Sequence, residues 1–173
     1  RFLAAVSDER PDDSDQWRDL IEGLWLSGLR IDEARRLTWH SSSFCVDLSS
    51  KHPRFRILAD GQRRRRDEIL PMAPEFANWL LRIPTGRRSG FVFPLVNSIT
   101  GNRFSSKRIV SFVSDIGRKA GIVANVETKK HATAHDLRRS FGVRWANRVK
   151  PLTLQRMMRH ANIETTLRYY VDL

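Results

Sequence analysis

The sequence predicts a mainly α-helical fold that includes one small three-stranded antiparallel sheet. Two observations support this class: apolar residues recur at helical spacing near both ends of the chain, and short alternating apolar runs occur between residues 44 and 72. A chain of 173 residues can bury about two-thirds of its unfolded surface in a single core. We therefore expect residues 1–173 to form one domain, and a fragment of a longer protein because the chain begins with Arg1.

The first helix is expected over residues 14–28, where Ser14 can cap its start. Its apolar residues recur at i, i+3, i+4, i+7 and i+8, and they are Trp17, Leu20, Ile21, Leu24 and Trp25. A short helix should follow Gly28, with Ile31, Ala34 and Leu37 on one face.

The sheet is expected from three short runs. Phe44, Val46 and Leu48 alternate, Phe55 and Ile57 alternate, and Ile69–Met72 forms the third run. The turn before the third strand contains Asp60-Gly61 and then four arginines, residues 63–66. A helix should begin near Pro74, because proline suits the first turn of a helix.

The second half of the chain is expected to be helical after a loop region. Residues 84–103 are rich in Gly, Pro, Ser and Arg and read as loops around the apolar run 91–93. A helix over about 105–119 should stop at Gly121, and three more should cover about 135–147, 152–159 and 163–171.

The charge balance predicts a polyanionic partner. The 31 Lys and Arg residues outnumber 19 Asp and Glu, giving a net charge of +12 and a pI near 11.1. Such a chain gains affinity for nucleic acid by neutralising phosphates and releasing their counterions. On composition alone, a ribosomal protein or a protein of another anionic surface remains an alternative.

Other features argue against membrane and secreted classes. No apolar run approaches the roughly 20 residues that span a bilayer, and residues 1–13 are too acidic for a signal peptide. Cys45 is the only cysteine, so the chain can form no internal disulfide and no cysteine-based metal cluster. We expect a soluble protein inside the cell.

Four short motifs could act together on a phosphodiester: Gly28 to Glu33, His135 to Arg138, His160, and the segment 165–170 that contains Tyr169. Each has an ordinary alternative when taken singly. In a chain with 25 arginines, Arg30 and Arg138 could lie on the surface, and the histidines and the tyrosine could be structural.

Taken together, these residue types suit attack on a phosphodiester. Two guanidiniums can stabilise the charge that develops on the non-bridging oxygens. A phenol, with an ordinary pKa of about 10, needs neighbouring cations and a base to act as a nucleophile near neutral pH. His135 and His160 can take up that proton or contact the phosphate. No set of acidic residues with metal-ligand spacing is present in the sequence.

The combination resembles the tyrosine recombinases, or phage-type integrases. Three boxes of that family are similar to segments of this chain: Gly28-Leu29-Arg30 with Glu33, His135 with Arg138, and His160 nine residues before Tyr169. The resemblance covers nearly the whole chain. It implies the catalytic domain of a site-specific recombinase or integrase, without the family's usual amino-terminal DNA-binding domain.

The resemblance also implies a mechanism. Tyr169 would be the nucleophile, Arg30, His135, Arg138 and His160 would stabilise the phosphate, and Glu33 would support them. The reaction would pass through a 3′-phosphotyrosyl intermediate with a free 5′-hydroxyl, and it would need no metal and no cofactor. Tyr170 is a rival nucleophile, but the nine-residue spacing favours Tyr169.

One departure concerns the basic turn. The family usually carries a Lys eight residues before the proline of the third strand, and that position is Arg63 here, counted from Pro71. An arginine holds phosphate but is a reluctant proton donor. We therefore expect either an electrostatic role for Arg63 in the site or a basic hairpin that only grips DNA. Arg64, Arg65, Arg66, Lys107 and Arg108 are expected DNA contacts.

Two other functions stay open. A type IB-like topoisomerase would share the chemistry without exchanging strands, and an inactive DNA-binding accessory module would bind without cleaving. The expected partners are double-stranded DNA and further copies of the chain, as a tetramer on DNA, with no membrane. A bacterial or phage-encoded protein of the cytoplasm, associated with the nucleoid, is expected.

Overall fold

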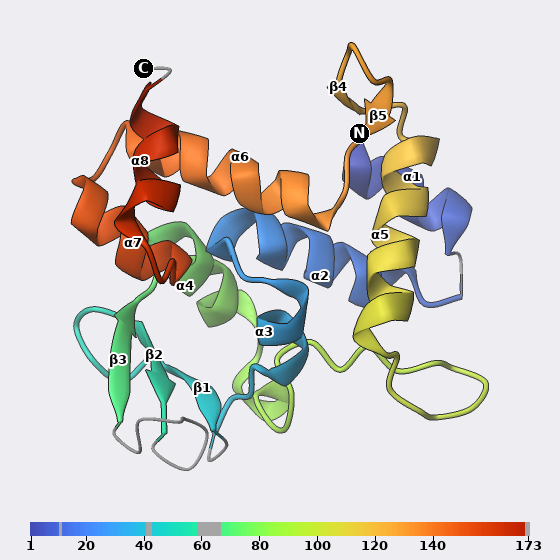
Figure 1. The fold of residues 1–173 in the computed structure, drawn as a ribbon. Coiled ribbons are helices and arrows are strands. Elements are labelled where there is room, and N and C mark those ends of the chain that lie inside the picture. Colours follow the sequence, from blue (N-terminus) through green and yellow to red (C-terminus); the bar gives the residue numbers. More distant parts are fainter. Residues whose placement is uncertain (11, 41–42, 59–66, 172–173) are drawn as a thin grey trace.

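The computed structural model describes residues 1–10, 12–40, 43–58 and 67–171. Within these ranges the chain is mostly helical, with two small sheets (Figure 1). The helices are α1 (Phe2–Glu9), α2 (Ser14–Ser27), α3 (Ile31–Arg36), α4 (Pro74–Arg82), α5 (Ser106–Lys119), α6 (Ala134–Ala146), α7 (Pro151–Met158) and α8 (Ile163–Val171), with a 3-10 turn at Thr85–Arg87. The strands are β1 (Phe44–Asp47), β2 (Arg54–Ile57), β3 (Glu68–Pro71), β4 (Val123–Asn125) and β5 (Lys130–His131).

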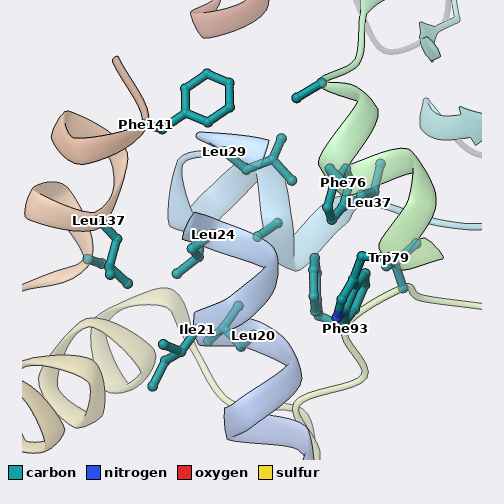
Figure 2. Packing of buried hydrophobic residues seen from close by; sticks show 14 of the residues in the cluster. Leu20, Ile21, Leu24, Leu29, Leu37, Phe76, Trp79, Phe93, Leu137 and Phe141 are labelled. Carbon is teal, nitrogen blue, oxygen red and sulfur yellow. The ribbon is translucent and has the colours of Figure 1, made fainter. Parts of the chain in front are cut away.

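Helix α2 is the centre of the core and packs against α1, α4 and α6. Its predicted apolar face is buried, and Leu20, Ile21 and Leu24 lie between the side chains of α4 and α6 in Figure 2. Trp25 lies at the edge of this face and is 38% exposed, with the Arg144 guanidinium over its ring. The helical periodicity therefore predicted the core correctly, and only its margin faces solvent.

Gly28 ends α2 and sets the direction of the next segment. Its backbone is left-handed, with φ at 62°, a conformation in which glycine carries no steric penalty. A Cβ at this position would also collide with the ring of Phe141 on α6. Only glycine satisfies both conditions, and the turn it makes brings Arg30 to the start of α3.

The three-stranded sheet has the predicted composition and is antiparallel in the order β1-β2-β3. Val46 pairs with Phe55 and Phe55 with Leu70, so three buried apolar residues line up across one face. The Phe55 ring packs against Phe76 of α4, with ring centroids 5.9 Å apart. This contact anchors the sheet to the helical core. The basic turn between β2 and β3, with Arg63, Arg64, Arg65 and Arg66, lies outside the described residues.

The predicted later helices are confirmed with small shifts of their ends. Pro74 is at the start of α4, and Gly121, with φ at 62°, follows the end of α5. Ser105 caps α5 by accepting a hydrogen bond from the backbone N–H of Arg108. The expected cap of α2 is wrong, because Asp13 precedes that helix and Ser14 is its first residue.

Two elements were not predicted. Helix α1 buries only Ala5 and Val6, and it packs against α2 and α5, so tertiary contacts rather than a periodic pattern support it. The β4–β5 hairpin has exposed or half-buried residues and therefore shows no apolar alternation. No helix in the described ranges has both the length and the apolar character that crossing a membrane requires.

Candidate active site

One pocket brings four of the predicted site residues together. A cavity of about 390 Å³ is lined by residues that include His135 and Arg138 of α6, His160 of the α7–α8 turn, and Tyr169 of α8. Helix α8 packs against both α6 and α7, which holds these segments side by side (Figure 1). The pocket is therefore assembled from two segments, 135–143 and 160–169, that are separated in the sequence.

Tyr169 lies in this pocket and Tyr170 does not. The Tyr169 ring is stacked on His160, with ring centroids 6.2 Å apart and an angle of 7° between the planes. It rests on Gly142 of α6, where an added Cβ would lie 2.6 Å from Cε1 of the ring. The Tyr170 hydroxyl instead donates to the Val149 carbonyl at 2.6 Å. The two neighbouring phenols thus have different surroundings.

His160 is held in one orientation beside the pocket. Its Nδ1 is hydrogen-bonded to Oγ1 of the fully buried Thr166 at 2.9 Å. Burial, followed by the positive charges of Arg138, Arg30 and Arg159, lowers the pKa of His160 to about 4. The imidazole is therefore neutral near neutral pH, and because Nδ1 is engaged, contact with a substrate would come through Nε2.

Arg138 is a buried cation at the floor of the pocket. Its side chain is only 6% exposed, and its two terminal nitrogens donate to the carbonyls of Gly28 and Met158. Burial, with the charges of Arg30 and Arg159, lowers its pKa to about 10, so it stays protonated at neutral pH. Each terminal nitrogen carries a second N–H beyond these two bonds.

Glu33 caps the start of α3 by accepting two hydrogen bonds from Arg30. The Glu33 carboxylate accepts from the Arg30 backbone N–H at 2.7 Å and from Arg30 Nη1 at 2.9 Å. Burial alone would raise the pKa of Glu33, but the charge of Arg159 and the hydrogen bond from Arg30 lower it below its usual value. The Arg30 side chain remains 48% exposed. Glu33 is thus ionised near neutral pH and hydrogen-bonded to Arg30. Arg30 itself does not line the pocket that contains Tyr169.

His135 and the two predicted basic residues of α5 differ in position. His135 is exposed in the first turn of α6, three residues before Arg138 and at the rim of the pocket. Lys107 and Arg108 are exposed in the first turn of α5, which packs against α1 and lies away from α8 in Figure 1. The structure does not bring them to the pocket.

Arg159 is a further residue of this region that the sequence analysis missed. Its guanidinium lies 3.1 Å from the Glu33 carboxylate, and its side chain is almost fully buried. Sequence spacing could not distinguish it among 25 arginines. The only signal was its position next to His160.

Acidification should destabilise the fold through His160. Because the folded pKa of His160 is about 4, below its ordinary 6.5, the unfolded chain takes up this proton first as the pH falls. The free energy of unfolding should therefore fall between about pH 6.5 and about pH 4, and be independent of this group above that window. We expect His160→Gln to lose less stability than the unsubstituted chain between about pH 7 and about pH 5 in urea unfolding. Equal losses would contradict the prediction.

Comparisons with known proteins identify the family of this chain. The phage integrase family model matches residues 3–173. Tyrosine recombinase XerC of Vibrio vulnificus strain YJ016 is 25% identical over 156 residues, which cover 88% of this chain and 45% of XerC. The chain thus spans about half the length of the curated relatives it matches.

Solved structures share the fold. XerA recombinase is 24% identical, with a TM-score of 0.59, over 97% of this chain and 56% of XerA. The Tn1549 transposon integrase in complex with transposon right end DNA is 22% identical, with a TM-score of 0.61, over 98% of this chain and 58% of that one. The catalytic domain of bacteriophage HP1 integrase is 19% identical, with a TM-score of 0.54, over 99% and 82% of the two chains. With a family match over nearly its whole length, this chain belongs to the phage integrase family.

Proposed function

We propose that this chain is the catalytic domain of a site-specific DNA recombinase or integrase, and that Tyr169 is its nucleophile. The observation that carries the proposal is the single pocket that contains Tyr169, a neutral His160 and the buried cation Arg138. Membership of the phage integrase family and the fold shared with an integrase solved on DNA support it.

The proposed reaction is a transesterification. The Tyr169 hydroxyl oxygen attacks a DNA phosphorus, a new bond forms between that oxygen and phosphorus, and the bond to the 5′-oxygen breaks. The products are a 3′-phosphotyrosyl protein and a DNA end whose 5′-oxygen has gained a proton. Rejoining is the same reaction with a 5′-hydroxyl as the attacking group, so the bond energy is conserved within the phosphodiester.

Each neighbouring residue has a proposed part in this step. Arg138 and Arg30 donate to the non-bridging oxygens, where charge increases in the transition state. A phosphate in the pocket would raise the pKa of His160, because an adjacent anion favours the protonated imidazole. His160 and the exposed His135 can then accept the phenol's proton or hydrogen-bond the phosphate. Exchange of both strands between two duplexes needs one nucleophile per strand, so the proposal includes a tetramer on DNA at the bacterial nucleoid.

The proposed function is tested by trapping the covalent intermediate. The probe is a pool of duplexes with randomised sequence around a nick just 3′ of the scissile position, from which the short product diffuses away. We expect an adduct that survives denaturation, and strand transfer to a second duplex when intact substrates are used. Binding without any adduct would instead identify an accessory module. An adduct with relaxation of supercoiled DNA but no strand transfer would identify a topoisomerase.

A separate prediction concerns Arg63, which we propose takes the place of the family's Lys. Arg63→Ala should slow cleavage without abolishing DNA binding, and Arg63→Lys should keep or raise it. A 5′-bridging phosphorothiolate, whose sulfur leaves without needing a proton, should rescue Arg63→Ala. As controls, Arg64→Ala and Arg65→Ala should weaken binding and reduce its salt slope by about one per lost phosphate contact. If Arg63→Ala lost only DNA affinity, and the phosphorothiolate did not restore its cleavage, Arg63 would bind DNA without assisting departure of the 5′-oxygen.

A further inference from the structure

Arg159 is a buried cation that lies behind the pocket rather than in it. It ends α7 and immediately precedes His160, and its side chain is 9% exposed. Arg138 is as deeply buried but lines the pocket, whereas Arg159 does not line it. Both terminal nitrogens of Arg159 already contact groups of the protein. Its contacts therefore have to be explained within the protein.

The contacts of Arg159 join two turns of the candidate site. Its Nη2 lies 3.1 Å from Glu33 Oε2 and donates to the Gly28 carbonyl at 3.1 Å. Its Nη1 donates to the Met157 carbonyl at 2.6 Å. Its own carbonyl accepts from the Arg30 guanidinium at 3.4 Å. One residue thus ties the α2–α3 turn, which carries Arg30, to the α7–α8 turn, which carries His160.

The same contacts reach the second phosphate-binding arginine. The Gly28 carbonyl accepts from both Arg159 and Arg138, and Glu33 lies 3.8 Å from Arg138 and 2.9 Å from Arg30. Arg159 is consequently bonded to the groups that orient both guanidiniums. Displacing it would release the shared carbonyl and carboxylate together.

Holding an arginine here is costly. Its backbone is left-handed, with φ at 54° and ψ at 44°, where residues with a Cβ are strained. Its Nε is buried without a hydrogen-bond partner in the part of the chain that is described. A merely structural turn would be better served by glycine, and departures from local rules concentrate at functional sites.

We propose that Arg159 is a positioning residue, which fixes Arg30 and Arg138 relative to His160 through Glu33 and the Gly28 carbonyl. This inference rests on the proposed function, since its readout is DNA cleavage. Arg159 acts through other residues and does not contact the substrate. Its loss should therefore slow the chemical step and leave DNA affinity nearly unchanged.

The test measures the single-turnover rate of adduct formation on the nicked duplexes, with enzyme in excess, and the dissociation constant for the same DNA. Arg159→Gly relieves the left-handed backbone and should cleave about 10- to 100-fold more slowly, the scale of an ångström-sized misplacement. Its dissociation constant should change less than about threefold. Arg159→Lys keeps the charge but cannot reproduce the fork of donors, so its rate should be intermediate.

Two controls separate positioning from stability. Arg144→Ala removes another partly buried arginine, which pairs with Glu75 at 3.1 Å outside the pocket. It should lower the melting temperature yet keep the cleavage rate when assayed well below that temperature. Glu33→Gln alone should also slow cleavage, because Glu33 holds Arg30. In the double variant Arg159→Gly with Glu33→Gln the two effects should be less than multiplicative, because both residues act through the same contact.

The outcomes are distinguishable. If the unsubstituted protein forms no adduct, the proposed function fails and this inference fails with it. If that protein is active and Arg159→Gly or Arg159→Lys cleaves at its full rate, positioning by Arg159 is wrong. A rise in the dissociation constant with an unchanged rate would make Arg159 a binding residue. Fully multiplicative effects in the double variant would show that Arg159 does not act through Glu33.

Discussion

Tyr169→Phe is expected to bind DNA with normal affinity and to form no covalent complex. The substitution removes only the oxygen, while the ring keeps its stacking on His160 and its packing against Gly142. The proposed reaction cannot proceed without the nucleophilic oxygen, so formation of the covalent complex should be lost completely. Denaturing gels of the nicked-duplex reaction measure it, and a binding assay on the same DNA verifies affinity.

Tyr170→Phe is the matched control, since it removes the same atom one residue away. The Tyr170 hydroxyl donates only to the Val149 carbonyl among the described contacts, so its loss should cost about 1 kcal/mol of stability and leave cleavage intact. If Tyr170→Phe abolished the adduct and Tyr169→Phe retained it, the assignment of the nucleophile would be reversed.

Arg30→Ala and Arg138→Ala should each slow cleavage by at least about 10²-fold. This is the scale seen when one preorganised donor to a developing charge is removed. The two variants should differ in stability. Arg30 is half exposed, whereas Arg138 is buried and bonded to two carbonyls, so only its loss should lower the melting temperature markedly.

Lysine variants at these positions test geometry against charge. Arg30→Lys and Arg138→Lys keep the positive charge but lose the paired donors, and they should restore little of the rate. Single-turnover rates below the melting temperature of each variant provide the comparison. Near-normal cleavage by Arg30→Ala would remove Arg30 from the site.

The sequence predicted those parts of the fold that bury one face. Leu20, Ile21 and Leu24 recur with the period of a helix, and Phe55 alternates with polar neighbours, because each lies between a core and solvent. Helix α1 and the β4–β5 hairpin have few buried residues, so no period could reveal them. The spacing of charged residues likewise does not record which of them are buried, as Arg159 illustrates.

In the candidate site, too, the sequence predicted some residues and could not predict others. Arg138, His160 and Tyr169 could be selected because their types and spacing match a known chemistry, and they line one pocket. Arg159 could not be selected, because its importance comes from burial against Glu33 and Gly28, which are more than a hundred residues away in sequence. Gly142 offered a weak signal, since a glycine inside a helix often has a packing reason, and here the Tyr169 ring rests on it.

The most direct test of the proposed mechanism is to locate the covalent bond to DNA. The trapped adduct can be digested with protease and nuclease, and the peptide that retains a nucleotide can be sequenced by mass spectrometry. The mechanism predicts a single modified peptide from α8, with the nucleotide attached through its 3′-phosphate to the oxygen of Tyr169. A nucleotide on Tyr170, on a histidine or on a serine, or an intact 3′-hydroxyl end with no modified peptide, would contradict it.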